Sequence, residues 1–549
     1  PPSWQRLGGR GLIARILLDE VPPRCDPLGP RNKLIWAPGL IVGHMVSSCD
    51  RISVGAKSPL TGGVKESNAG GTTGLQMVSL GIKAVLLEGD LLADGWWVLH
   101  VSKDGMRFEA GDDLAGLGAY PAAEKLRARY GDKVALGLIG PGGEMRLAAS
   151  GILNLDKDRE PSRINARGGM GAVMGARRLK AIVIDGAGGE KPPLADPSLF
   201  KAGQKQYTQE VMAHPQTAIY RDYGTAGLAT MTHGFGALPT RGFSTGDFEG
   251  IDKISGEALR DLMLSRGGAS EPSHACMPGC VIQSSNCFGG PQGEKIVSPL
   301  EYETIGLVGS NLGIDSLDDI GRLNWEINDL GLDTIDTGAA LGVAAQAGLM
   351  RFGDAARAME LLGEIRQGTP LGRVLGSGAA VTGRVLGVRR VPVVKGQAMP
   401  AYDPRAIKGT GVTYATSAQG ADHTCGLTIR AKIDHLDPKV QADLSRTAQI
   451  NMAGYDTLGV CIFGGFGFAK APGAIRDLIN GRYGWGVGDD VLQELGLETL
   501  RLERAFNLAA GFDASDDRIP EWMTQEPLPP HNSVFDVDDG DLDRVAGWS

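Results

Sequence analysis

The spacing of the apolar residues changes once along the chain, near residue 190. From Trp4 to about Gly189, short apolar runs such as KLIWAPGLIVG, WWVLHVS and LKAIVIDG alternate with glycine turns, which is typical of a sheet interleaved with a few helices. From Pro192 onward, apolar residues recur three and four positions apart in long segments such as DSLDDIGRLNWEINDLG, which predicts helices. A proline-bearing stretch, RRVPVVKGQAMPAYDP, interrupts this pattern near residue 392. We therefore predict an α+β fold, with an N-terminal mixed β domain followed by two mainly α-helical domains, at residues 1–190, 191–392 and 393–549.

The composition narrows the classes of partner. A chain of 549 residues can form roughly three domains and bury a large cofactor. Its formal net charge of −9, with no dense cluster of lysine and arginine, argues against nucleic-acid binding. No run of about 18 apolar residues predicts a membrane span, no signal peptide is evident, and the seven cysteines do not follow a secreted disulfide pattern. We expect a cytoplasmic protein that binds small molecules or other proteins.

Three of the seven cysteines lie in the segment HACMPGCVIQSSNC, which ends at Cys287. The spacing C-x3-C-x6-C, with a proline and a glycine between Cys276 and Cys280, favours one metal centre. Zinc usually has closely spaced cysteine pairs or histidine partners, whereas an iron-sulfur cluster takes four thiolates and accepts a distant one, for which Cys461 is the best candidate. The alternative is a set of buried free cysteines, the interpretation that we favour for Cys25, Cys49 and Cys425.

Two short segments repeat one pattern. NDLGLD at 328–333 and DTLGVC at 456–461 both follow a helical segment, and both have a polar residue, then a glycine three positions later, then an aliphatic residue. One interpretation is a helix C-terminus closed by glycine. The other is a pair of equivalent polar loops that hold the two halves of a pseudo-symmetric ligand.

Other polar segments, taken singly, are weaker evidence for a binding or catalytic site. RGGMGAVMG at 167–175 contains G-x-G-x-x-x-G, but the polar stretch before it cannot be the buried strand of a dinucleotide fold. Its glycines, like those of SPLTGGVKESNAGG at 58–71, still allow backbone amides to approach phosphate. Glu303 in EYE and His423 in GADHT are single polar residues, a kind that is usually solvated.

Taken together, these segments resemble the tungsten-containing aldehyde ferredoxin oxidoreductase family. The segments that carry the resemblance occur in family order over nearly the whole chain: GGRGLIARILLDEVPPRCDPLGPRNKL, AKSPLTGGVKESNAGG, ARGGMGAVMGARRLKAIVI, SPLEYETIGLVGSNLGID, NDLGLDTID, AYDPRAIKGTGVTYATS, GADH, DTLGVC and EPLPPHNSVFDV. The resemblance implies that the N-terminal domain forms a base for two pterins, whose dithiolene sulfurs hold tungsten or molybdenum. Members usually open with a strand before GGRGL that is absent here, which indicates an incomplete N-terminus or a sheet completed by another subunit.

The resemblance also implies the site residues. A Mg²⁺ ion that bridges the pterin phosphates would bind the backbone carbonyls of Asn68 and Gly168. The residues that would contact the pterins are Arg51, Arg167, Asn328, Asp333, Thr334, Asp456 and Val460. In catalysis, Glu303 would move the proton, His423 would orient the carbonyl oxygen of the substrate, and Tyr414 would act as a hydroxyl donor.

The cysteine segment departs from the family pattern. Some members have C-x2-C-x3-C, which places Ser273 at the first position, and others have C-x3-C-x3-C, which places Ser284 at the third. Either way one expected thiolate is a serine, and Cys287 lies three residues beyond Ser284 as its replacement. We therefore predict that a 4Fe-4S cluster is bound by Cys276, Cys280, Cys287 and Cys461.

The implied function is the oxidation of an aldehyde to a carboxylic acid, with electrons passed through the cluster to ferredoxin or another iron-sulfur electron-transfer protein. Two alternatives stay open: the reduction of an acid or an aryl thioester on the same cofactors, and a non-catalytic metal-binding subunit in which the pterin loops are relics. No E-x-x-H pair occurs at 322–328, where some members carry the metal ligands of a dimer interface. A metal-bridged dimer is therefore not expected, whereas a homodimer held by packing is compatible with the sequence.

Overall fold

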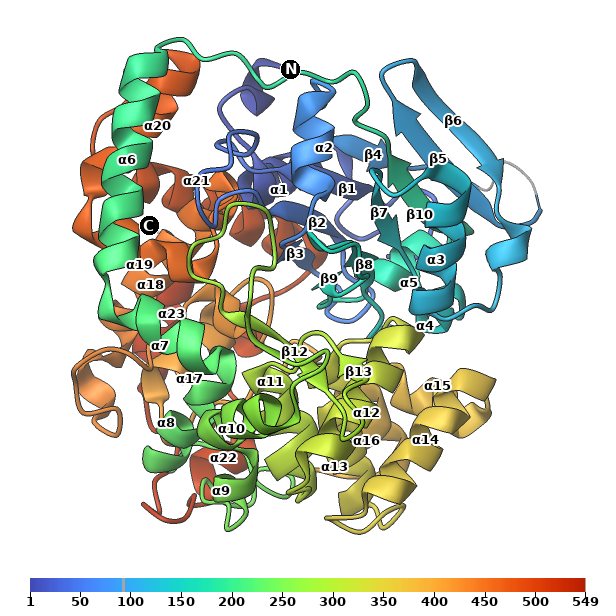
Figure 1. Ribbon diagram of the computed structural model, residues 1–549. Coiled ribbons are helices and arrows are strands. Elements are labelled where there is room, and N and C mark those ends of the chain that lie inside the picture. The colour runs from blue at the N-terminus through green and yellow to red at the C-terminus, as the bar shows by residue number, and fades with distance from the viewer. Residues whose placement is uncertain (91–93, 549) are drawn as a thin grey trace.

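A computed structural model describes residues 1–90 and 94–548 and confirms the predicted α+β fold (Figure 1). Two sheets lie in the N-terminal part. The first is antiparallel, in the order β3-β2-β1-β4. Its strands are β1 (Leu34–Pro38), β2 (Ile52–Lys57), β3 (Val64–Ala69) and β4 (Val85–Leu87). Every residue of β1 and β2 is buried, because other elements cover both faces of this sheet.

The second sheet has the order β6-β5-β10-β7-β8-β9, and only β5 and β10 pair in parallel. Its strands are β5 (Trp97–Ser102), β6 (Gly105–Ala110), β7 (Ala135–Leu138), β8 (Ile152–Asn154), β9 (Arg163–Asn165) and β10 (Leu179–Ile184). The short helices of this part are α1 (Gly9–Glu20), α2 (Thr73–Ser79), α3 (Ala119–Tyr130), α4 (Pro141–Glu144) and α5 (Met170–Gly175). Strands β7-β8-β9 repeat the up-and-down order of β1-β2-β3, so that the two sheets present similar edges to the rest of the molecule.

Helices dominate after residue 196, as the apolar spacing predicts. They are α6 (Pro197–Ala213), α7 (Pro215–Tyr223), α8 (Leu228–Gly234), α9 (Ile251–Ile254), α10 (Gly256–Arg266), α11 (Tyr302–Thr304), α12 (Leu317–Leu330), α13 (Thr334–Gln346), α14 (Ala355–Gln367), α15 (Pro370–Leu375), α16 (Ala379–Leu386), α17 (Lys408–Thr416), α18 (Gln441–Leu458), α19 (Gly465–Lys470), α20 (Pro472–Tyr483), α21 (Val491–Ala510), α22 (Glu521–Gln525) and α23 (Asp539–Ala546). Two small sheets interrupt them, formed by β11 (Glu271–His274), β12 (Ser285–Gly289) and β13 (Lys295–Val297), and by β14 (Val393–Val394) and β15 (Gln397–Ala398).

The predicted domain boundaries at residues 190 and 392 stay predictions. Helix α6, which follows the first boundary, packs against α19 and α20 from the last third of the chain (Figure 1). Gly203 of α6 allows this close packing, since a Cβ at this position would lie 3.0 Å from the Cβ of Asp477. Helix α1 likewise packs on α18 and α21, so the N-terminal part and the last third share a buried core. Among the described residues, no helix is both long and apolar enough to cross a lipid bilayer.

Candidate active site

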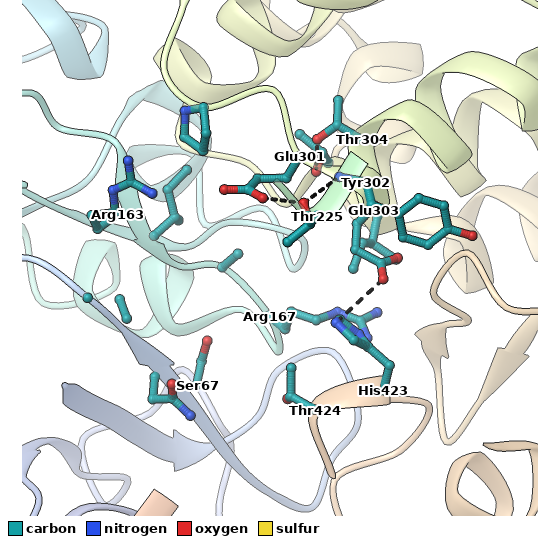
Figure 2. A pocket seen from close by; sticks show the side chains of 18 of the residues that line it. Ser67, Arg163, Arg167, Thr225, Glu301, Tyr302, Glu303, Thr304, His423 and Thr424 are labelled. Carbon is teal, nitrogen blue, oxygen red and sulfur yellow. Dashed lines mark hydrogen bonds and ion pairs between the residues drawn. The ribbon is translucent and has the colours of Figure 1, made fainter. Parts of the chain in front are cut away.

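A cavity of about 360 Å³ lies where the edges of the two N-terminal sheets meet the helical part. Its wall includes ten of the predicted site residues: Arg51, Asn68, Arg167, Cys276, Glu303, Asn328, Asp333, Thr334, His423 and Cys461. The other predicted site residues do not lie on the described part of the wall: Gly168, Cys280, Cys287, Tyr414, Asp456 and Val460. Figure 2 shows that side chains from all three parts of the chain point into this space. The structure therefore brings most of the predicted residues together, while their roles stay predictions.

The two repeated segments are helix ends closed by glycine. Helix α12 ends at Gly331, with φ 74°, and α18 ends at Gly459, with φ 85°, and this left-handed conformation favours glycine. The Gly331 carbonyl accepts a hydrogen bond from the backbone of Gly151, just before β8, at 2.9 Å. The Gly459 carbonyl accepts one from Arg51, just before β2, at 3.2 Å. Each loop is thus docked on the equivalent edge of one N-terminal sheet, beside the cavity.

The residues around the second helix end form one hydrogen-bonded group. The Asn68 side chain accepts from Arg51 Nε and donates from Nδ2 to Asp456 Oδ1 at 2.9 Å. Burial raises the pKa of Asp456 to about 6, although the Arg10 guanidinium opposes this shift. The backbone carbonyl of Asn68 also accepts from Arg51 Nη2 at 3.2 Å. Arg51 Nη1 makes no hydrogen bond with the described residues, so it can donate to a bound anion.

Arg167 donates most of its hydrogen bonds to other groups of the protein. Its guanidinium donates to Asp333 Oδ2 at 3.2 Å and to the carbonyls of Ala398 and Ala421 at 2.5 and 2.6 Å. Asp333 in turn caps α13 by accepting from the Ile335 amide at 3.0 Å. These bonds connect the N-terminal part to both helical segments, and they leave few Arg167 donors for a ligand.

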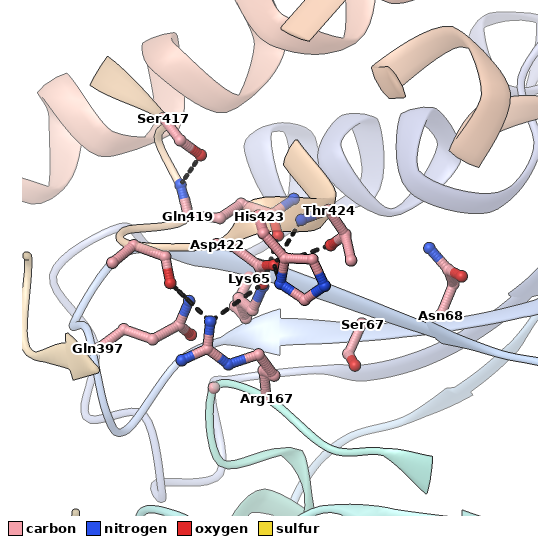
Figure 3. A network of polar contacts seen from close by, with 12 residues as sticks. Lys65, Ser67, Asn68, Arg167, Gln397, Ser417, Gln419, Asp422, His423 and Thr424 are labelled. Carbon is pink, nitrogen blue, oxygen red and sulfur yellow. Dashed lines mark hydrogen bonds and ion pairs between the residues drawn. The ribbon is translucent and has the colours of Figure 1, made fainter. Parts of the chain in front are cut away.

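Asp422 holds two buried cations next to the loop of His423 (Figure 3). Its Oδ2 accepts from Lys65 Nζ at 2.7 Å and lies 3.8 Å from Arg167 Nη1. Burial opposes ionisation, but Lys65 and Arg167 outweigh it and hold the pKa of Asp422 well below its usual range. A carboxylate that stays ionised fixes the backbone beside His423, since its other oxygen accepts from the Thr424 amide at 3.0 Å.

Glu303 and His423 face each other across the cavity wall. Glu303 Oε1 lies 3.4 Å from His423 Nε2, while Glu303 Oε2 accepts from the Ala401 amide at 2.8 Å (Figure 2). The His423 ring packs against Tyr402, with 5.7 Å between the ring centroids. Glu303 Oε1 and His423 Nδ1 are both buried without a well-aligned hydrogen bond. Glu303 is therefore held through Oε2, whereas Glu303 Oε1 and the His423 ring lack a hydrogen bond among the described residues and can interact with a substrate.

The tyrosine on the cavity wall near His423 is Tyr402, a residue that sequence reasoning missed. Tyr414 is fully buried in α17, its hydroxyl has no hydrogen-bond partner among the described residues, and burial raises its pKa well above the usual range. Tyr302 also lines the cavity, with its hydroxyl on Thr232 Oγ1 at 2.8 Å. The predicted role of Tyr414 stays a prediction, and Tyr402 lines the described wall of the cavity whereas Tyr414 does not.

A second polar group on the wall was also missed. Glu301 bonds to Thr225 Oγ1 and accepts from Ser285 Oγ at 3.2 Å, and burial raises the pKa of its carboxyl. Arg163 donates to Ser285 at 2.9 Å, but its Nε and Nη2 atoms are buried without hydrogen bonds. The second glutamate of the EYE segment could have indicated Glu301 in the sequence, but residues two positions apart on a helix do not usually face the same cavity.

Three of the four predicted cluster thiols lie together. Cys276 and Cys461 line the cavity, and the hydrogen bond between Cys276 and Cys280 raises the pKa of Cys276 while it lowers that of Cys280 to about 5. Ionisation of Cys461 would raise the pKa of Cys276 further. The backbone is also tight here, since a Cβ on Gly70 would lie 3.1 Å from Cys276 Sγ.

The fourth predicted ligand, Cys287, makes its contacts elsewhere. Its Sγ lies 3.9 Å from His274 Nδ1 and 3.4 Å from Ser298 Oγ. Ser284, not Cys287, lines the cavity with Cys276 and Cys461. The reason is the pairing of β11 with β12, which sets Cys287 opposite Glu271. Cys287 as the fourth cluster ligand therefore stays a prediction, and in this structure its side chain contacts His274 and Ser298.

Cys49 is a further thiol near this group. It is fully buried, burial raises the pKa of its thiol well above the usual range, and the thiol donates to the Ser47 carbonyl at 3.1 Å. Its neighbour Ser48 contacts Cys280 Sγ at 3.3 Å. No local pattern of residues connects Cys49 with the distant cysteines, since more than 200 positions separate it from Cys280.

Comparisons with known proteins identify the class. Residues 2–186 match the family model of the aldehyde ferredoxin oxidoreductase N-terminal domain, and residues 202–545 match that of its domains 2 and 3. The tungsten-containing aldehyde ferredoxin oxidoreductase of Thermococcus kodakarensis is 31% identical over 95% of this chain and 88% of its own length, and that of Pyrococcus furiosus gives the same figures. The aliphatic sulfonate oxidoreductase, WOR-like subunit, of Pyrococcus furiosus is 26% identical over 95% of this chain and 85% of its own length.

A solved structure shares the fold. The active site complex BamBC of benzoyl coenzyme A reductase, in complex with 1,5-dienoyl-CoA, superposes with a TM-score of 0.79 at 18% identity, covering 99% of this chain and 90% of that one. The fold and the matched relatives define an oxidoreductase enzyme. The chain belongs to the aldehyde ferredoxin oxidoreductase family, which confirms the resemblance seen in the sequence.

Proposed function

We propose that the protein oxidises an aldehyde to a carboxylic acid at a tungsten or molybdenum bis-pterin centre. Relatives at 31% identity are named tungsten-containing aldehyde ferredoxin oxidoreductases. The observation that carries the proposal is the Glu303–His423 pair, 3.4 Å apart, in a cavity that also exposes the thiols of Cys276 and Cys461. A proton-transfer pair beside ligands for an electron-transfer cluster is what an oxidation that releases protons and electrons requires.

The residues present fit the cofactors that the family implies. Among the described residues, Arg51 Nη1 has no hydrogen-bond partner and can donate to a phosphate. Backbone carbonyls suit Mg²⁺, and those of Asn68 and Gly168 each accept one side-chain hydrogen bond, from Arg51 and Ser58, while a carbonyl oxygen carries two lone pairs. Three adjacent thiols, those of Cys276, Cys280 and Cys461, suit an iron-sulfur cluster. When bound, the bis-pterin metal supplies a two-electron acceptor and the 4Fe-4S cluster a one-electron relay toward ferredoxin or another iron-sulfur protein.

We propose separate tasks for the two residues of the pair. The balanced reaction converts an aldehyde and water into a carboxylic acid, two protons and two electrons. Glu303 Oε2 is held by the Ala401 amide, so Oε1 is the oxygen that takes a proton as water adds to the carbonyl carbon. His423 Nε2 points to the same space and positions the carbonyl oxygen by a hydrogen bond. The buried wall limits competing contact with bulk water.

The reverse direction is the second candidate. The same proton pair serves the reduction of an acid or an aryl thioester, because the proton on Glu303 Oε1 can move either way. Activity is therefore measured in both directions with a low-potential viologen dye, over a series of aldehydes and the matching acids. Aldehyde-dependent dye reduction supports the proposal, whereas turnover only in the reducing direction replaces it.

Metal analysis tests the proposal independently of substrate. The purified protein is analysed for tungsten, molybdenum, iron and magnesium, with an electron paramagnetic resonance spectrum after dithionite reduction. We expect about one tungsten or molybdenum and about four irons per chain, the content of one metal centre and one 4Fe-4S cluster. Absence of both group-six metals and of pterin would leave only the non-catalytic subunit.

A further inference from the structure

A mixed set of metal-binding side chains lies at the base of the β11–β12 hairpin. Glu271, at the start of β11, pairs directly with Cys287 on β12, and His274, at the end of β11, pairs with Ser285 after an irregularity in the register. His274 Nδ1 is 2.9 Å from Glu271 Oε2 and 3.9 Å from Cys287 Sγ. One ligand atom from each of the three residues lies within 4.8 Å of the other two. An ion placed between these three atoms would therefore be close to all of them.

The opposite edge of the His274 ring is held by carboxylates. His274 Nε2 lies 3.5 Å from Asp156 Oδ2 and 3.3 Å from Asp158 Oδ2. Asp156 is itself buried, and its Oδ2 accepts from Ser162 Oγ at 2.9 Å. A carboxylate beside one ring nitrogen of a metal-binding histidine is the usual support of such a ligand. Nδ1 faces Glu271 and Cys287, and an ion bound there would replace the hydrogen that Nδ1 now shares with Glu271 Oε2 at 2.9 Å.

We propose that Glu271, His274 and Cys287 bind a zinc ion that is separate from the iron-sulfur cluster. A carboxylate oxygen, an imidazole nitrogen and a thiolate sulfur form the donor set that zinc accepts in four-coordinate sites, with water as the fourth ligand. The three atoms need to move only slightly to reach the usual zinc distances of about 2.0–2.3 Å. The Glu271 side chain is 60% exposed, which gives the ion an entry path, whereas that of His274 is only 2% exposed.

The position of this site gives the ion a structural role. The loop between Glu271 and Cys287 carries Cys276 and Cys280, the two neighbouring thiols of the predicted cluster. An ion bound across the paired ends of β11 and β12 closes this loop at its base and reduces the conformations open to it. The zinc site therefore lies at the base of the cluster loop, and it accounts for Cys287 without making it a cluster ligand.

The test measures zinc and iron per chain in the anaerobically purified full-length protein. The protein is dialysed against Zn²⁺, the excess is removed, and both metals are counted in the unchanged chain and in the variants Cys287→Ala, Glu271→Gln and Cys276→Ala. We expect about one zinc per chain in the unchanged protein. Cys287→Ala and Glu271→Gln should weaken Zn²⁺ binding about 10-fold or more while iron stays constant.

Cys276→Ala is the matched control, because it removes a thiol from the same loop. It should lower iron and keep zinc. Substitution with Co²⁺ adds a second measurement: a thiolate-to-cobalt charge-transfer band is expected in the unchanged protein and absent in Cys287→Ala. The proposal is overturned if the unchanged protein holds no zinc after dialysis, or if Cys287→Ala loses iron instead of zinc. Neither readout depends on aldehyde turnover, so failure of the zinc site is distinct from failure of the proposed function.

Discussion

At the scale of single residues, the carboxyl of Glu303 is the most informative group in the cavity. One oxygen is fixed by the Ala401 amide and the other is unpartnered except for His423 Nε2 at 3.4 Å. A buried group with an open acceptor is costly unless a ligand or substrate satisfies it. The same argument applies to Arg163, whose Nε and Nη2 atoms are buried without a hydrogen bond among the described residues and whose charge acts on Glu301.

Replacing this carboxyl tests its role directly. Glu303→Gln keeps an oxygen for the Ala401 amide but cannot accept and release a proton, so we expect turnover to fall by about 100-fold or more, with unchanged tungsten or molybdenum and iron content. The exposed variant Glu498→Gln is the control and should retain full activity. Dye-linked activity and metal content are measured on the same samples. Retention of most activity by Glu303→Gln would remove Glu303 from the proposed chemistry.

Ionisation of the buried Asp50 should make the stability of the folded protein depend on pH. Asp50 is buried, Oδ1 accepts from the Gly43 amide at 2.8 Å, Oδ2 has no hydrogen bond among the described residues, and burial raises its pKa to about 7. Between the unfolded pKa of 3.8 and about 7, the folded state keeps a proton that the unfolded state has lost. Stability contributed by this group therefore falls as pH rises through that window, by at most about 4 kcal/mol.

Asp50→Asn removes this loss because the amide does not ionise. The variant should gain apparent thermal stability over the unchanged protein at pH 8, and the gain should shrink progressively as the pH is lowered toward 4. Scanning calorimetry across this range measures both proteins. An advantage of the variant that is equal at all pH values would mean that ionisation of Asp50 is not the cause.

At the scale of elements, the two helix ends show how glycine sets the position of the cavity loops. A Cβ on Gly459 would lie 2.8 Å from Val42 Cγ2 and 3.0 Å from Gly39 Cα, and one on Gly331 would lie 2.7 Å from the Gly140 nitrogen. Glycine therefore supplies both the left-handed turn and the close approach to the sheet edge.

A pair of glycine variants separates these two requirements. Gly387 also ends a helix, α16, in the left-handed conformation, with φ 69°, but a Cβ there would meet nothing within 4 Å. Gly387→Ala should cost about 1 kcal/mol of stability from the backbone conformation alone. Gly459→Ala should cost clearly more and also lower the tungsten or molybdenum content, because its Cβ displaces the loop. Apparent melting temperatures and metal analysis measure this; equal costs for the two variants would show that close packing is not required.

At the scale of the whole molecule, a buried ion cluster joins the N-terminal part to the last third of the chain. Arg10 of α1 binds Glu503 of α21 through two bonds of 2.7 and 2.9 Å, and Asp456 of α18 at 3.2 Å. Gln419 also donates to Glu503 at 2.9 Å. Asp456 belongs both to this cluster and to the hydrogen bonds of Asn68, so the cavity wall depends on the contact between these parts.

Removal of one partner should be costly because it leaves a buried charge unpaired. Arg10→Met should destabilise the protein by about 3–5 kcal/mol, and the double variant Arg10→Met/Glu503→Met should recover part of this loss. The exposed pair Arg544–Asp443, at 2.7 Å, is the control, and Arg544→Met should cost less than about 1 kcal/mol. Chemical unfolding followed by fluorescence measures all three. Similar losses for Arg10→Met and Arg544→Met would contradict the argument from burial.

The sequence by itself determined the family, the fold class and most helices and strands, because apolar spacing and turn residues act over a few positions. LKAIVIDG predicted β10, and DSLDDIGRLNWEINDLG predicted α12. Only the tertiary structure decided how the cysteines are grouped. The pairing of β11 with β12 turns Cys287 toward Glu271 and His274, whereas chain segments far apart bring Cys49 and Cys461 toward Cys280. Strand register and long-range packing set these neighbours, and a local pattern of residues does not contain that information.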